Sequence, residues 1–467
     1  MTTSQVTRPA TQSSQEPPAA PAPRPEEYRP PRRWIRRSGG GPRRLGTRMV
    51  AALVLIAVLC ALTVAGAIGV RRDTVQLRDT VAQRAAAAAQ LRFALADLDA
   101  QRADTLAPGV SAADPLVLVG NQLNALLTAQ QRRAQVSDLL RQLAGDTSQQ
   151  ARVSALLDGL GRYDDLSGRA AYVAEQNPNQ IVGQPPRVAV SMNVQAGEVM
   201  HDELLPAADR LASAYQQQAA DRQSTAHDGA VRWALAIGLI GLLALLFLVW
   251  WQWQLARDYR RLLTPGLLVA TAATLAIGLA GALAFGGTAG SVSSAGNDGL
   301  RPWTRLAEAR AVAAQAAASE SRWFVHGADY SAADTAAFNG LIEQLQSLLS
   351  PDGYATAAER PGYADVLTRF GHFRADDKRL RELQAQGRTA EAAEVLTSVT
   401  RGDVAFDFWD FATTLDALAG RQLDDFTAHA ADARDSLDQW PALPAGALGV
   451  SAVLVLLAVR PRFAEYR

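Results

Sequence analysis

Four long apolar runs without a charged residue divide the chain. They contain 20 to 23 residues each, and a helix needs about 20 residues to cross a hydrocarbon core about 30 Å thick. The runs therefore predict four transmembrane helices, at residues 49–70, 233–253, 265–287 and 440–459. A signal peptide is the alternative for the first run, but the 48-residue leader and the length of the run argue against it.

The two long segments between these runs, residues 71–232 and 288–439, have helical rather than strand patterns. Apolar residues recur every three or four positions, and no stretch alternates as a half-buried strand does. Each segment has the length of a four-helix bundle flanked by two spans. The pattern predicts an all-α membrane protein, with four transmembrane helices and two extracytoplasmic four-helix-bundle domains of the sensor type.

In the first segment, the first span is expected to continue outward as a helix over residues 73–103. Asp114 and Pro115 suit the cap and the first position of a second helix, over residues 116–144. A fourth helix is expected from 191 through 222 into the second span, with a kink at Pro206. The third helix carries an apolar stripe of Val153, Leu156, Leu157, Leu160, Tyr163, Leu166, Ala170 and Val173.

The second segment predicts the same number of helices. We expect them over residues 301–326, 334–349, 363–386 and 403–439, with a short turn at 391–396. The repeated order of span, bundle and span suggests a tandem duplication of architecture, although the two sequences do not align as a repeat.

Charge gives the expected orientation. Residues 1–48 have a net charge of +7, and residues 254–264 and 460–467 have +2 each. Cytoplasmic loops are enriched in Arg and Lys, so these three segments are expected inside the cell, in a multi-pass plasma-membrane protein with both termini cytoplasmic. The proline-rich arm, residues 1–48, is expected to be disordered. It either lies against anionic lipid or docks a cytoplasmic partner.

Composition excludes several functional classes. The 46 basic and 46 acidic side chains balance, whereas a nucleic-acid binder normally has a basic excess. A single cysteine excludes an intramolecular disulfide framework. The chain also lacks a Walker loop, a dinucleotide fingerprint, a nucleophile elbow and a kinase signature. We therefore expect no enzyme activity, no cofactor and no metal.

Two clusters of polar residues are candidates for binding a ligand or a partner. The alternatives are surface ion pairs on the first helix and a packed histidine at the end of the later one. The candidates are Arg92, Asp97, Asp99, Arg102, Glu320, Arg322, Trp323 and His326. Asp403, Asp407 and Asp410 share one helical face, which is better explained as a solvated face than as a metal site.

The cytoplasmic side offers no output domain, because the inner loop has 11 residues and the tail has eight. A signal is therefore expected to pass to a separate protein. The exposed candidates for this coupling are Arg257, Asp258, Tyr259, Arg260 and Arg261, together with the arm and the tail.

The third apolar run carries a stripe of small residues at every fourth position, which allows helices to approach closely in lipid. The partner is either another span of the chain or a second protomer, so a homo-oligomer is possible. The stripe consists of Gly266, Ala270, Thr274, Gly278, Ala282 and Gly286.

Several local motifs resemble the actinobacterial GlnX-type four-span membrane proteins. The similar stretches in the first segment are "LRFALADLDAQRAD", "YDDLSGRAAYVAEQNPNQ" and "MHDELLPAADRLASAYQQQAADRQ". In the second they are "LAEARAVAAQAAASESRWFVHG" and "ADDKRLRELQAQGRTAEAAEVL". The resemblance covers residues 49–460, and the chain departs from it at Trp323–Val325 and at Lys378 and Arg379.

The resemblance implies a signal transducer. In that family the ectodomains are thought to receive an amino-acid-binding lipoprotein, and the cytoplasmic face to influence a soluble Ser/Thr kinase of the protein kinase G type. A structural or assembly factor of the cell envelope is the alternative function. A transporter is disfavoured, because the spans contain no ionisable group.

Overall fold

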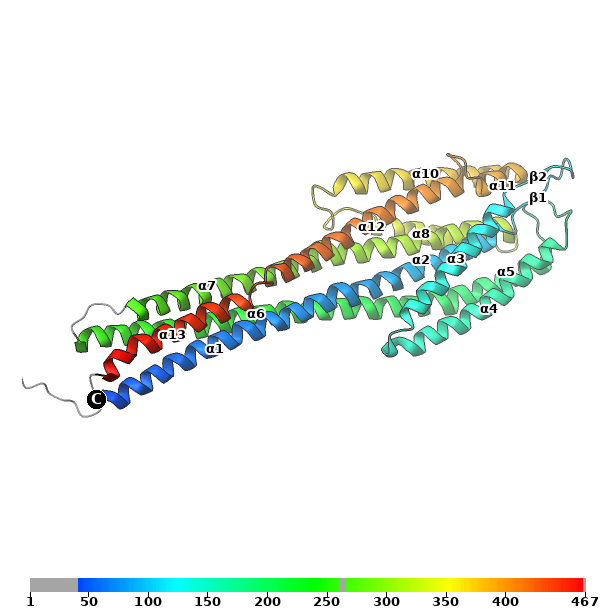
Figure 1. The fold of residues 1–467 in the computed structure, drawn as a ribbon. Coiled ribbons are helices and arrows are strands. Elements are labelled where there is room, and N and C mark those ends of the chain that lie inside the picture. The colour runs from blue at the N-terminus through cyan, green and yellow to red at the C-terminus, as the bar shows by residue number, and fades with distance from the viewer. Residues whose placement is uncertain (1–40, 260–264, 465–467) are drawn as a thin grey trace, which may run out of the picture. The chain divides into compact units, whose positions relative to one another are not determined.

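The computed structural model describes residues 41–259 and 265–464 (Figure 1). It divides into two compact units, residues 1–47 and residues 48–467. The first unit contributes only its described residues 41–47, which begin helix α1 (Gly41–Gln76). The architecture below is that of the second unit.

Three helices in the described part are long and apolar enough to cross a membrane. The first joins α1 to α2 (Gln83–Asp104), the second contains α6 (Leu205–Tyr259), and the third joins α7 (Pro265–Ser294) to α8 (Arg301–His326). The fourth apolar run forms α13 (Ala442–Ala464), whose apolar part is shorter, at Ala442–Ala458. Three candidate spans therefore agree with the expected ones, and the fourth stays a prediction.

Each of these three long helices contains a six-residue π-helical turn within the described residues: η1 (Leu77–Ala82), η3 (Val199–Leu204) and η4 (Ala295–Leu300). The turns η1 and η4 follow the first and third apolar runs, so the two halves of the chain share this feature. The turn η3 ends two residues before Pro206. It is the local distortion of the helix at this proline, whose ring would clash with a carbonyl of a regular α-helix.

The second helix of the first segment, α3 (Gln122–Leu143), begins six residues later than expected. Asp114 does not cap it; its side chain instead accepts the backbone N–H of Leu116 at 3.0 Å and forms a turn. This turn joins two short antiparallel strands, β1 (Gly109–Val110) and β2 (Leu118–Val119). Asn121 caps α3 instead, accepting the N–H of Asn124 at 3.0 Å. Strands of two residues are too short for an alternating pattern.

The remaining elements of the first segment are η2 (Thr147–Gln149), α4 (Gln150–Glu175) and α5 (Arg187–Glu198). Most of the predicted stripe of α4 is buried, including Tyr163, but Leu157 is exposed. The Val70–Arg72 and Ala230–Trp233 junctions both lie inside continuous helix, as expected.

The second segment contains α9 (Ser331–Leu348), α10 (Arg360–Ala385) and α12 (Val404–Asp435), close to the expected ranges. The expected turn at 391–396 is wrong: these residues belong to α11 (Thr389–Thr397), whose Ala392 and Leu396 are buried. Helix α12 ends at Asp435, and a break separates it from α13.

Helices α2 and α8 pack side by side at the centre of both segments (Figure 1). Both are rich in alanine, and Ala88, Ala94, Ala313 and Ala314 are fully buried. Small side chains let two helices approach closely and pack densely. Helices α3 and α6 pack on α2, and α9 and α12 pack on α8. The described residues of the two segments thus share one continuous hydrophobic core.

The small-residue stripe of α7 faces a helix of the same chain. A Cβ added at Gly278 would lie 3.4 Å from the Cα of Gly241 in α6. At its other end, Gly266 lies against Leu454 and Ala458 of α13. Tight packing around Gly266 and Gly278 is therefore accounted for within one chain, whereas Gly286, at the end of the stripe, is exposed and has no described atom within 4 Å of an added Cβ.

Candidate functional site

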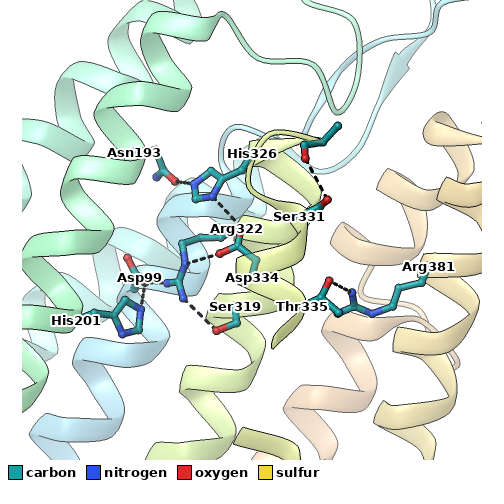
Figure 2. A network of polar contacts seen from close by, with 11 residues as sticks. Asp99, Asn193, His201, Ser319, Arg322, His326, Ser331, Asp334, Thr335 and Arg381 are labelled. Carbon is teal, nitrogen blue, oxygen red and sulfur yellow. Dashed lines mark hydrogen bonds and ion pairs between the residues drawn. The ribbon is translucent and has the colours of Figure 1, made fainter. Parts of the chain in front are cut away.

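A buried ion pair joins α2 and α8. Asp99 and Arg322 are 3% and 6% exposed. Nη1 of Arg322 donates to Oδ2 of Asp99, and Nη2 donates to the hydroxyl of Ser319 at 3.1 Å (Figure 2). Charges are almost never buried unless they are paired, because desolvation is costly. The pair therefore fixes the relative position of two helices that belong to different halves of the chain.

Two neutral groups complete the surroundings of Asp99. Tyr163 on α4 donates its hydroxyl to Oδ1 of Asp99 at 3.1 Å. Burial raises the pKa of Tyr163 well above its ordinary value, so it remains a neutral donor. His201 on η3 lies with Nε2 at 3.8 Å from Oδ2 of Asp99. Burial, assisted by the Arg322 cation, lowers the pKa of His201 and favours the neutral ring at pH 7.

The network continues through His326 to two further helices. Nδ1 of His326 lies 3.0 Å from Oδ2 of Asp334 on α9, and Nε2 lies 3.0 Å from Oδ1 of Asn193 on α5. The other oxygen of Asp334 is 3.9 Å from Nε of Arg322. Figure 2 shows Arg322 between Asp99 of the first half and Asp334 of the second. We call the set of Asp99, Tyr163, Asn193, His201, Ser319, Arg322, His326 and Asp334 the polar network.

Glu320 and Trp323, which lie one helical turn apart on α8, contact residues outside the polar network. Glu320 is 1% exposed, and its neighbour for hydrogen bonding is the carboxyl of Asp377. Burial raises its pKa well above the ordinary value, and nearby Asp377 raises it further. The guanidinium of Arg381 lies 4.4 Å from the Trp323 ring and donates to Asp377 at 2.7 Å. Glu320 is thus a neutral, buried acid rather than an exposed binding group.

The candidates on α2 also have different partners. Asp99 belongs to the polar network, whereas Asp97 pairs with Arg132 of α3 and Arg92 pairs with Asp209 of α6. Nε of Arg102 is buried without a hydrogen-bond partner in the described part of the chain. Asp97 and Asp99 are buried, so surface ion pairing does not explain them.

The candidates for cytoplasmic coupling are described only in part. The guanidinium of Arg257 lies 5.6 Å from the Trp253 ring near the end of α6. Asp258 and Tyr259 end this helix, but their side chains are outside the described residues, as are Arg260 and Arg261 entirely.

The three aspartates at the start of α12, of which Asp403 directly precedes the helix, have separate partners. Asp403 lies 3.5 Å from Arg379, Asp410 lies 3.0 Å from Arg369, and Asp407 contacts Asp376. No group of side chains within residues 41–259 and 265–464 has the arrangement of a metal site.

Sequence reasoning missed several residues of the polar network. Tyr163 was recognised only as part of an apolar stripe, and Asp334 only as a helix start. Asn193 and His201 precede Pro206 in a helix whose π-helical turn has no sequence signature. Their convergence depends on how α4, α5 and α9 pack around the α2–α8 pair.

A comparison with known protein families gives one finding. Residues 73–224 match the family model of the actinobacterial sensor domain. The match contains Asp99, Tyr163, Asn193 and His201, whereas Arg322 and His326 lie beyond it. No curated protein and no solved structure matches the chain significantly. The chain is therefore similar to actinobacterial sensor proteins, and this similarity indicates a signalling role.

Proposed function

We propose that the chain is a non-enzymatic transmembrane signal transducer. It receives an extracytoplasmic signal of solute or amino-acid status, brought by an amino-acid-binding lipoprotein, and passes it to a cytoplasmic Ser/Thr kinase. The sensor-domain match over residues 73–224 supports a sensory role, and the three apolar helices support a place in the membrane. In this proposal α13 is the fourth span, and both termini are cytoplasmic.

The polar network is the observation that carries the proposal. It lies where α2 and α8 meet, and each of these helices continues through a π-helical turn into an apolar helix. A partner that changes the α2–α8 contact would displace helices that are rigidly joined to the spans. π-Helical turns often occur at functional sites, and η1 and η4 are placed where such a displacement would pass. The displacement would reach the segment 254–264 and the N-terminal arm, where the cytoplasmic partner would bind.

Breaking helix continuity tests the mechanism. Two glycines inserted between Val70 and Arg71 interrupt α1 below η1 and should uncouple signalling, because flexible residues cannot transmit a displacement. The matched control inserts two glycines after Gly145, in the turn between α3 and η2. The readout is the change in cellular Ser/Thr phosphorylation when external glutamine is added. An unchanged response in the first variant, inserted normally in the membrane, would overturn the mechanism.

Crosslinking tests the partners. A photoreactive amino acid at exposed Tyr172 or Tyr330 should capture a solute-binding lipoprotein. The same group at Arg257 should capture a Ser/Thr kinase. Capture of cell-envelope assembly proteins alone, at both faces, would favour a structural role and contradict the transducer.

A further inference from the structure

A cavity of about 420 Å³ is lined by residues of both halves of the chain, none of which belongs to the polar network. It is formed by α2 and α3 of the first half together with α8, α11, α12 and the loop before α12. Ligand pockets of small molecules typically span roughly 300–1,000 Å³. The size suits a ligand of about the dimensions of an amino acid or a small amine.

Aromatic side chains form the apolar wall of this cavity. Phe93 comes from α2, whereas Phe406, Phe408 and Trp409 come from α12. The rings of Phe406 and Trp409 lie 5.7 Å apart, and Trp409 is 57% exposed. An aromatic side chain left that accessible beside a cavity can pack on an incoming ligand.

The two cations of the cavity are already neutralised by acids of the protein. Arg132 pairs with Asp97, and Arg310 pairs with Asp416 at 2.5 Å. Both guanidinium groups also stack on Phe93, at 5.4 and 4.0 Å from its centroid. An anionic ligand would have to break one of these pairs.

Asp104 is the remaining acid of the cavity, and no arginine or lysine pairs with it among the described residues. Its Oδ1 is buried and has no hydrogen-bond partner there either. A buried carboxylate oxygen without a partner is costly, so such an atom is suited to accept a hydrogen bond from a ligand. The cavity thus combines one unpaired anion with aromatic faces, which is the chemistry that recognises an organic cation.

We propose that this cavity binds a small organic molecule with a protonated amine, whose ammonium group pairs with Asp104 and whose apolar part packs on Trp409 and Phe406. The ligand touches both halves, so its binding stabilises one arrangement of α2 and α3 against α11 and α12. The backbone N–H of Asn121 donates to Thr397 at 3.2 Å beside the same cavity and links the same two halves. The role of this ligand in signalling rests on the proposed function, whereas its binding to the cavity can be measured independently of that function.

Protonation of Asp104 gives the binding a pH dependence. Burial, with a smaller contribution from the nearby Asp97 carboxyl, raises the pKa of Asp104 to about 7, although a hydrogen bond from Ser321 lowers it. The other ionisable groups around it are Glu320 on α8 and the cavity residues Arg132, Arg310 and Asp416. A protonated Asp104 cannot pair with a cation, so affinity should rise as pH increases from about 6 to 8.

The test uses the purified full chain in lipid nanodiscs, titrated calorimetrically with three related probes. 2-Phenylethylamine has the amine alone, phenylalanine has amine and carboxylate, and 3-phenylpropanoate has the carboxylate alone. Putrescine and glutamine extend the set to other amines. We expect saturable binding of at least one amine and none of 3-phenylpropanoate. Tighter binding of phenylalanine or glutamine would identify amino acids as the ligand class. Tighter binding of phenylethylamine or putrescine would identify simple amines as the ligand class.

Variants assign the binding to the cavity. Asp104→Asn should weaken amine binding at least tenfold. Trp409→Ala should weaken it several-fold without destabilising the hydrophobic core, because Trp409 is exposed. Asp165→Asn is the control, because this exposed residue of α4 pairs only with Arg169 in the described structure. Binding of 3-phenylpropanoate as tight as that of the amines, no binding of any amine, or full affinity in Trp409→Ala would overturn the proposal. Loss of kinase signalling with intact amine binding would contradict the proposed function alone.

Discussion

At the scale of single residues, the Asp99–Arg322 pair should be costly to break. A buried ion pair contributes little net stability, but removing one partner leaves an uncompensated buried charge and costs about 3–5 kcal/mol. Arg322→Met should therefore strongly lower the thermal unfolding midpoint of the full chain in detergent. Adding Asp99→Asn should restore much of the loss, because the unpaired charge is then gone.

The matched control is the exposed pair of Arg169 and Asp165, 2.9 Å apart on α4. Exposed pairs contribute roughly 0–1 kcal/mol, so Arg169→Met should change the unfolding midpoint little. A double variant of the buried pair as unstable as Arg322→Met would show that packing, rather than the unpaired charge, causes the loss.

Glu320 should tolerate replacement by its neutral isostere. Its raised pKa means that the folded chain holds the carboxyl in its neutral form, which Gln resembles in shape and polarity. Glu320→Gln should keep or raise the unfolding midpoint at pH 7.5. The control is Glu343→Gln at an exposed position, which should leave the unfolding midpoint unchanged. A loss of several degrees in Glu320→Gln alone would mean that Arg381 depends on an ionised Glu320.

The sequence identified Asp99, Arg322 and His326 as candidates but not their mutual contact. Polar residues inside alanine-rich helices are visible in the sequence, whereas their partners come from positions up to 223 residues apart. Asp104 was not recognised as a candidate. Phe93, Asp97, Gln101 and Asp104 recur on one face of α2 at helical spacing, a pattern from which the cavity face could have been inferred.

At the scale of elements, η4 requires a glycine against α12. A Cβ at Gly299 would lie 2.7 Å from backbone and Cβ atoms of Phe426, which cannot rotate away. Gly299→Ala should destabilise the chain by about 1–3 kcal/mol, the usual effect of overpacking. Gly290 of α7 has no atom within 4 Å of the same position in the described structure, so Gly290→Ala should be neutral or stabilising by about 0.5–1 kcal/mol. Equal unfolding midpoints for the two variants would contradict the close approach.

Long helices were predictable, because their apolar periodicity extends over many turns. The range 301–326 agrees with α8 at both ends. The short β1–β2 hairpin and α11 were missed, since a few residues cannot establish a period. The π-helical turns were missed for another reason. The residues of a π-helical turn are of the same types as those of an α-helix, so the amino-acid sequence does not distinguish the two, and only Pro206 indicated a distortion.

At the scale of the whole second unit, the sequence predicted two separate bundles, but the α2–α8 contact joins the described residues into one core. Contacts between distant halves leave no local pattern, so the shared core could not be inferred. The consequence is that both halves should unfold together, because the core that stabilises each includes the other.

This shared core should also make stability depend on pH. Burial raises the pKa of Asp104 and of Asp376 to about 7, and Asp407 contributes to the shift of Asp376. In the unfolded chain both carboxyls have lost their protons well below pH 6, so between about pH 6 and 8 the folded chain holds more protons. Its free energy of unfolding should therefore fall as pH rises across this window. His201, whose pKa is lowered, is mainly neutral in both states above pH 6.5 and does not reverse the trend.

Thermal unfolding of the full chain in detergent, measured from pH 6.5 to 8, checks this prediction. The midpoint should decrease by a few degrees over the window, and Asp104→Asn and Asp376→Asn should each remove part of the decrease. At pH 8 both variants should be more stable than the parent chain, because an amide avoids the cost of a buried carboxylate. The exposed Asp165→Asn should keep the full pH dependence. A midpoint that rises toward pH 8, or an unchanged slope in the double variant, would show that these carboxyls ionise in the folded chain as they do in water.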